Sequence, residues 1–200
     1  GVQTCALPIC VVAVSGSGAI STTGAGSYGI EALGSGTVTV NRTGTITTTG
    51  AGADGIVATG GFVTVSSGSV STTGTGAEAL RVAAGAGAAN VTVNGAVSSA
   101  QSYGALISGT TTASLTVNSG SSVTGGTNFD AVDITSVTGS TITNAGTISR
   151  VGTGFAIDAN GGAATLTNSG AINGAIDLTG NNDTVTNTGI INHKIGRAHV

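Results

Sequence analysis

One short phrase, an alternating strand followed by a polar turn and a second apolar step, recurs along almost the whole chain. Its clearest copies are Thr141–Ile148 (TITNAGTI), Thr165–Ile172 (TLTNSGAI) and Thr184–Ile191 (TVTNTGII). Fainter copies fill the earlier part of the chain: Thr37–Ile46, Val63–Val70, Val91–Val97 and Leu115–Val123. Because strands this short cannot bury a face alone, the phrase must be stacked on its own copies.

The glycines that close the polar turns measure the repeat. They are 26, 24, 27, 25, 26, 24 and 19 residues apart, at Gly18, Gly44, Gly68, Gly95, Gly120, Gly146, Gly170 and Gly189. A solenoid tolerates such slippage because extra residues enter its loops. We therefore expect an all-β fold, a single-stranded right-handed parallel β-helix of about seven to eight coils with about 25 residues per coil.

The composition excludes the other repetitive architectures. The chain has 36 glycines in 200 residues and only 6% charged residues, whereas an average protein has about 25% charged residues. Disordered chains are charged and poor in β-branched residues, and this chain is neither. Collagen requires a period of three and many prolines, but Pro8 is the only proline. No apolar run reaches the length of a transmembrane helix.

Two apolar columns can be read from the repeats, and each predicts one wall of the solenoid. The first column is Val38, Val40, Val63, Val65, Val91, Val93, Leu115, Val117, Ile142, Leu166 and Val185. The second follows a small residue in each repeat and is Ile30, Ile56, Leu80, Leu106, Val132, Ile157 and Ile176. The alternating threonines are expected to face water: Thr39, Thr64, Thr92, Thr116, Thr143, Thr167 and Thr186.

Asparagines recur at the corners. Asn118, Asn144, Asn168 and Asn187 each lie two residues before a turn glycine, and Ser66 occupies the same slot. Stacked in register, such residues form a ladder of side-chain amides that satisfies buried corner groups. We interpret them as structural residues and not as ligands.

The two ends differ from the middle and resemble translated sequencing-adapter DNA. Val2–Ile9 can be reverse-translated into a strand whose reverse complement encodes Ile195–Val200 and then a stop codon. We therefore expect residues 1–10 and 194–200 to be adapter-derived artefacts and residues 11–193 to be a β-helix segment truncated at both ends. The Cys5–Cys10 pair is then expected to be neither a disulfide nor part of a zinc site.

The T-x-T-N-x-G-x-I units, set in cysteine-free sequence rich in Gly, Ser, Thr and Asn, resemble the passenger regions of bacterial autotransporters and related surface adhesins. The resemblance covers nearly all of residues 11–193. It implies a right-handed parallel β-helix at the cell surface or outside the cell, exported by type V secretion. It also implies a C-terminal outer-membrane β-barrel on a part of the polypeptide beyond this sequence.

Several sets of residues are candidate sites. Asp133, Asp158 and Asp177 directly follow the second apolar column, with Glu31 and Arg81 in the same slot of earlier coils. Stacked, they are either a calcium site or three solvated acids. A hydrolase carboxylate pair would come from Asp130 with Asp133, or from Asp158 with Asp177.

Basic and aromatic residues add little to these sites. The only basic residues of the segment apart from His193 are Arg42, Arg81 and Arg150, which lie on different coils. The aromatic residues near the second column are either a sugar-stacking row or corner packing: Tyr28, Tyr103, Phe129 and Phe155. We expect no catalytic residue, cofactor or metal in this segment, so it is not expected to be an enzyme.

The function that follows is a non-catalytic stalk or adhesive segment, in contact with host surface molecules, glycans or copies of itself. The alternative is a non-catalytic flank of a β-helical carbohydrate-active enzyme of the polysaccharide lyase or hydrolase type. Eight acidic residues outnumber the arginines of the segment. This balance argues against a nucleic-acid partner, because such partners are bound through Lys and Arg.

Overall fold

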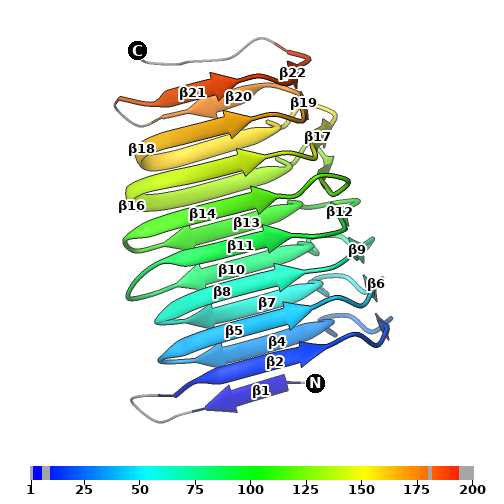
Figure 1. The fold of residues 1–200 in the computed structure, drawn as a ribbon. Coiled ribbons are helices and arrows are strands. Elements are labelled where there is room, and N and C mark those ends of the chain that lie inside the picture. Colours follow the sequence, from blue (N-terminus) through cyan, green and yellow to red (C-terminus); the bar gives the residue numbers. More distant parts are fainter. Residues whose placement is uncertain (1, 6–9, 180–181, 194–200) are drawn as a thin grey trace.

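The molecule is built from three walls, each made of parallel β-strands. The computed structural model describes residues 2–5, 10–179 and 182–193, and these form 22 strands with no helix among them. Each strand pairs in parallel with the strand one coil away on the same wall. The expected all-β parallel β-helix is confirmed (Figure 1).

Each coil adds one rung to each wall. Wall 1 contains β1 (Val2–Cys5), β4 (Ile30–Gly34), β7 (Ile56–Gly60), β10 (Leu80–Ala84), β13 (Ala105–Gly109), the first parts of β16 (Val132–Asn144) and β18 (Ile157–Asn168), and β20 (Ile176–Leu178). Wall 2 contains β2 (Val12–Gly16), β5 (Thr37–Arg42), β8 (Phe62–Ser67), β11 (Ala89–Val93), β14 (Thr112–Val117), the second parts of β16 and β18, and β21 (Thr184–Asn187). Wall 3 contains β3 (Ile20–Thr22), β6 (Ile46–Thr48), β9 (Val70–Thr72), β12 (Ala96–Ser99), β15 (Ser122–Thr127), β17 (Thr147–Val151), β19 (Ala171–Asn173) and β22 (Ile190–Ile191).

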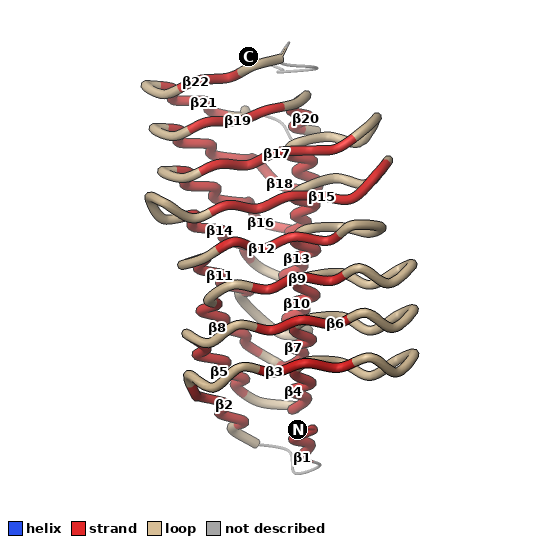
Figure 2. The backbone as a smooth tube through the Cα atoms, turned by 90° about the vertical axis from the view of Figure 1, so that its right-hand side faces the viewer, coloured by secondary structure: helices blue, strands red, loops and turns tan. Residues whose placement is uncertain are grey.

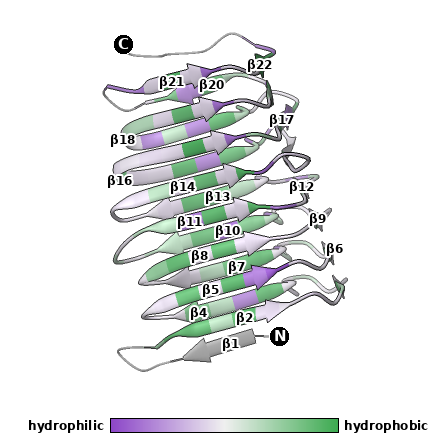
Figure 3. Ribbon diagram, viewed as in Figure 1, coloured by the Kyte–Doolittle hydropathy of each residue, from purple (hydrophilic) through white to green (hydrophobic). Residues whose placement is uncertain are grey.

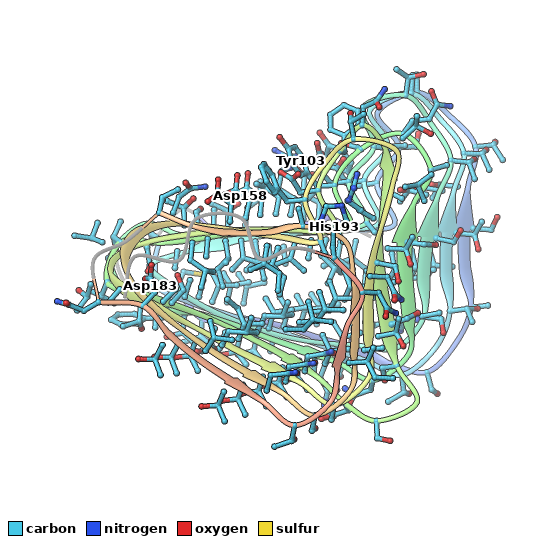
Figure 4. All side chains as sticks on the ribbon, turned by 90° about the horizontal axis from the view of Figure 1, so that it is seen from above. Tyr103, Asp158, Asp183 and His193 are labelled. Atoms are coloured by element: carbon cyan, nitrogen blue, oxygen red, sulfur yellow. The ribbon has the colours of Figure 1, made fainter. Side chains whose placement is uncertain are left out.

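The chain winds in a right-handed sense. Seen from above, with later coils nearer the viewer, it runs anticlockwise through walls 2, 3 and 1 (Figure 4). Six turns, from β4 to β19, lie wholly within the described residues. This count is slightly below the expected seven to eight, because the turns before and after contain residues outside the described part.

The predicted apolar columns form the core. On wall 2, Val40, Val65, Val91, Leu115, Ile142 and Leu166 pair in register and are at most 2% exposed. The second apolar step of the phrase makes wall 3, where Ile46, Val70, Val97, Val123, Ile148 and Ile172 stack inward. Apolar and polar residues alternate along the strands in Figure 3. None of the seven threonines expected to face water is buried, which confirms that prediction.

The prediction for one residue of the second apolar column, Leu106, is wrong. Ala105, and not Leu106, pairs with Leu80 and Val132 in the inward column. Leu106 pairs with Arg81 and Asp133 in the outward column and is only half-buried. A one-residue slip moves a side chain to the opposite face of a sheet, and the preceding corner in this coil is one residue shorter than the sequence spacing suggested.

The predicted asparagine ladder is present but divided. Asn144 and Asn168 are fully buried, and Asn144 Nδ2 donates to Asn168 Oδ1 at 2.7 Å. Asn168 Nδ2 donates in turn to Asn187 Oδ1 at 2.7 Å. Asn118 is not part of this buried ladder. Its side chain is exposed, and its Nδ2 donates to Asn94 Oδ1 at 2.7 Å.

The asparagine ladder is divided because the corners of successive coils differ in length. Val117 pairs with Asn144, and Ser122 with Thr147, so the lower coil places Asn118 outside the strand pairing. Ser66 joins the exposed series by accepting a hydrogen bond from Asn94 Nδ2 at 3.0 Å. The single continuous ladder predicted from the sequence is therefore wrong, although both shorter ladders exist.

Long loops between walls 3 and 1 project from the lower coils (Figure 2). A hydroxyl group at the end of β3, β6 and β9 anchors the following loop by donating to a carbonyl oxygen five residues on. These bonds are Thr22 to Ser27 at 2.6 Å, Thr48 to Ala53 at 2.5 Å and Thr72 to Ala77 at 2.7 Å. The loops therefore hold a fixed position beside the outer face of wall 1.

The first residues also join the stack. β1 pairs in parallel with β4, from Val2 opposite Glu31 to Cys5 opposite Gly34. Cys10, just before β2, is disulfide-bonded. The expectation that Cys10 takes part in no disulfide is therefore wrong.

Candidate functional site

The stack aligns acidic residues on the outer face of wall 1. Asp133 on β16 pairs with Asp158 on β18, and Asp158 pairs with Asp177 on β20. Lower on the wall, Glu31, Val57 and Arg81 continue the same column to Leu106. The expected stacking of the three aspartates is thus confirmed, as is the shared slot of Glu31 and Arg81.

A second acidic residue reaches this column from the corner. Asp130 precedes β16, and its Oδ1 accepts the backbone N–H of Phe155 at 2.5 Å. Asp130, Asp133 and Asp158 each bring a carboxylate oxygen within 4.8 Å of the others. We call these three residues the carboxylate cluster. The predicted Asp130–Asp133 pair therefore meets, with Asp158 as a third member, while Asp177 stays outside the cluster.

Burial and mutual repulsion raise the pKa values of the cluster. The pKa of Asp133 rises to about 6, first through burial and then through the charges of Asp158 and Asp130. Burial also raises the pKa of Asp130 and that of Asp158, opposed by hydrogen bonds from the Phe155 N–H and the Asn160 amide. A carboxyl with a raised pKa can donate a proton near neutral pH.

In the lower coils a buried acid, Asp54, is paired with an arginine. Asp54 is 2% exposed, and its Oδ2 lies 2.7 Å from the Nε of Arg81. Its Oδ1 accepts the backbone N–H of Glu78 at 3.0 Å. Burial, followed by the neighbouring Glu78, raises the pKa of Asp54, and Arg81 opposes this rise. The Arg81 guanidinium also lies 5.8 Å from the centre of the Tyr28 ring.

Aromatic residues line the corner beside the acids. Tyr28, Tyr103, Phe129 and Phe155 are all half-buried, and none belongs to the core of buried apolar side chains. Tyr103 and Phe129 pack edge to face with ring centres 5.4 Å apart. Burial, followed by the charges of Asp133 and Asp130, raises the pKa of Tyr103. The side chains of Tyr103 and Asp158 lie along the same side of the molecule in Figure 4.

The arginines do not gather at the cluster. Arg42 lies on wall 2, Arg81 on wall 1 and Arg150 on wall 3. Arg42 is 7% exposed, and its Nη2 donates to the Gly18 carbonyl. The Nη2 of Arg150 lies 3.4 Å from the Nε2 of His193. The prediction that the three arginines are scattered over different coils is confirmed, whereas the burial of Arg42 could not be read from its sequence position.

The cluster has a limited chemistry. Three carboxylates can share a proton or contact a cation, but calcium takes six to eight oxygen ligands. Acid–base hydrolysis uses two carboxyl groups with separate roles, and a lyase acting on an acidic polymer would need positive charge beside the cluster. The arrangement as it stands is a proton-binding patch on an otherwise weakly charged rod.

Comparisons with protein-family models, curated proteins and solved structures found no match for this chain. No helix in the described part of the chain is long and apolar enough to cross a membrane. The site and the fold are therefore the basis for assigning a role.

Proposed function

We propose that this chain is a non-catalytic stalk and adhesive segment of a secreted or surface-displayed β-helical protein of the autotransporter passenger type. The observation that carries the proposal is the continuous parallel strand pairing on all three walls from β4 to β19, in which the register shifts only between Thr124 and Thr127 and between Ser136 and Gly139. Such a stack is a rigid spacer, because each coil contacts only its neighbours and coils add length without changing the cross-section. The expected location is the cell surface.

The outer faces suit weak, repeated contacts. Most outward positions carry Thr, Ser or Asn, and only 6% of all residues are charged. Many weak contacts to a neighbouring cell, a host surface molecule, a glycan or a second copy add up through effective concentration. An outer-membrane β-barrel elsewhere on the same polypeptide would anchor the rod, as the repeat style of the sequence suggests.

Surface display tests the proposal. The 200-residue chain is fused to a translocating β-barrel on a laboratory bacterium, and cell settling and adherence to host cells are compared with the barrel alone. We expect faster settling or more adherent cells, and the effect should survive Asp133→Asn and Asp158→Asn. Cells that behave like the barrel-only control would refute an adhesive role.

The carboxylate cluster beside Tyr103 favours one competing function, a β-helical carbohydrate-active enzyme or its flank. That function predicts release of reducing ends from polyuronates or neutral glycans by the purified chain. It also predicts loss of this release in Asp133→Asn, with a maximum rate near the raised pKa of Asp133, at about 6. Such turnover would overturn the non-catalytic proposal.

A further inference from the structure

Wall 2 carries two uninterrupted polar columns on its outer face. One column runs through Thr39, Thr64, Asn90, Ser114, Thr141, Thr165 and Thr184. The other runs through Asn41, Ser66, Thr92, Thr116, Thr143, Thr167 and Thr186. None of these side chains is buried, and none is charged. The three last rungs of both columns are threonine alone, and we call these six residues the threonine array.

The backbone fixes the spacing of these groups in two directions. Neighbouring rungs lie about 4.8 Å apart, and residues i and i+2 on one strand lie about 6.7 Å apart. The strands of wall 2 keep nearly the same direction along the rod (Figure 1). The hydroxyl groups therefore form a nearly rectangular mesh, and this mesh is close to the oxygen spacings on a prism face of hexagonal ice.

Threonine is well suited to hold such a mesh. Its β-branched side chain is stiff at χ1, so each hydroxyl group loses little conformational freedom when it binds. The hydroxyl group donates and accepts, which allows it to anchor ordered water, while the adjacent methyl group confines that water. A face of this kind presents first-shell water already arranged in a repeating pattern.

The two columns lack what other partners require, and the exposed Phe62 on the same face lies at the start of β8, outside both columns. Protein interfaces concentrate binding energy in Trp, Tyr and Arg, and none of these occurs in either column. Nucleic acids and anionic lipids need Lys or Arg, which are also missing from both columns. Neither of the other walls has two such columns side by side. The outward column of wall 1 mixes Glu31, Val57, Arg81, Leu106 and Asp133. Wall 3 has a single polar column, which runs through Ser21, Thr47, Ser71, Ser98, Thr124, Ser149 and Asn173.

We propose that the outer face of wall 2, centred on the threonine array, is an ice-binding surface. The neutral, two-dimensionally periodic hydroxyl mesh would hold water in a lattice that merges with the ice surface, and the bound rod would stop growth there. The inference stands on the register and exposure of wall 2, and it does not depend on the proposed role as a stalk.

Ice growth in the presence of the purified 200-residue chain tests the inference. Thermal hysteresis and crystal shape are measured by osmometry for the parent chain and for Thr143→Tyr and Thr167→Tyr. Thr47→Tyr on wall 3, where Thr47 is exposed and outward, is the matched control. Far-UV circular dichroism and the urea midpoint establish that all four proteins are folded alike.

We expect faceted crystals and measurable hysteresis for the parent chain and for Thr47→Tyr, and loss of both for the two wall 2 variants. A tyrosine in the array holds the neighbouring hydroxyl groups away from the ice, whereas a tyrosine on wall 3 does not. Unfaceted crystals without hysteresis for the folded parent chain would overturn the inference. So would hysteresis unchanged by both wall 2 variants, or wall 2-dependent binding to a polysaccharide without any effect on ice.

Discussion

Removing one asparagine from the buried ladder is expected to cost far more than removing one from the exposed ladder. Asn168 is fully buried. Its Oδ1 accepts from Asn144 at 2.7 Å, and its Nδ2 donates to Asn187 at 2.7 Å and to the Ile190 carbonyl at 3.2 Å. Asn168→Ala deletes all these bonds and leaves the buried Asn144 amide with fewer partners.

The magnitude follows from the hydrogen bonds lost. Two amide–amide bonds contribute about 1 kcal/mol each, and an under-satisfied buried donor adds about 1 kcal/mol more. Asn168→Ala should therefore lower the free energy of unfolding by about 3 kcal/mol. Asn118→Ala removes one bond from an exposed side chain, where water replaces it, so we expect a loss below about 0.5 kcal/mol.

Replacing the whole ladder provides a second control. The inward column that holds Asn144 and Asn168 already contains Val93 and Val117 in lower coils. Substituting valine at positions 144, 168 and 187 together removes the amide–amide bonds in pairs. It also takes these partners from the Gly146 N–H and from the Ala171 and Ile190 carbonyls. The triple variant should therefore cost more than Asn168→Ala.

Urea unfolding followed by circular dichroism gives the free energies, and hydrogen exchange shows where the protection is lost. The loss should be greatest in the coils around Gly170 and Ile190, because each coil of a solenoid contacts only its neighbours. If Asn168→Ala proves as mild as Asn118→Ala, the buried ladder does not stabilise these corners and the reasoning fails.

Three further outcomes follow from the structure. Since the folded pKa of Asp133 lies above its ordinary value of 3.8, at about 6, the folded state binds more protons between these values, and stability should fall as pH rises from about 4 to about 6. In urea titrations at several pH values, Asp133→Asn should make this fall smaller without abolishing it, because Asp54, Asp130 and Asp158 also have raised pKa values. Arg81→Met leaves the buried Asp54 without its cation and should cost about 2 kcal/mol, less than for a fully buried pair because the Arg81 side chain is 41% exposed, and adding Asp54→Asn should restore much of the loss in the same assay. Gly50→Ala places a Cβ against the Gly24 carbonyl and should cost about 2 kcal/mol, while Gly18→Ala meets no atom within 4 Å and should be nearly neutral, as thermal unfolding midpoints would show.

The local pattern of the sequence was enough to determine the architecture. A strand, a polar turn and an apolar step repeated near 25 residues can bury its apolar positions only by stacking. The inward columns of Val40 and Ile148 and the outward column of Asp133, Asp158 and Asp177 follow from the period-2 alternation of a strand. Nothing beyond the spacing of the repeats was needed to place them.

The corners were decided by the tertiary structure. Leu106 turned outward and Asn118 left the buried ladder because corners differ in length by one or two residues, and one residue is enough to reverse a side chain. The approach of Asp130 to Asp133 and Asp158, and the burial of Arg42, likewise depend on how each corner folds. Turn conformation depends on contacts with the coils above and below, so these positions could not be read from the repeat alone.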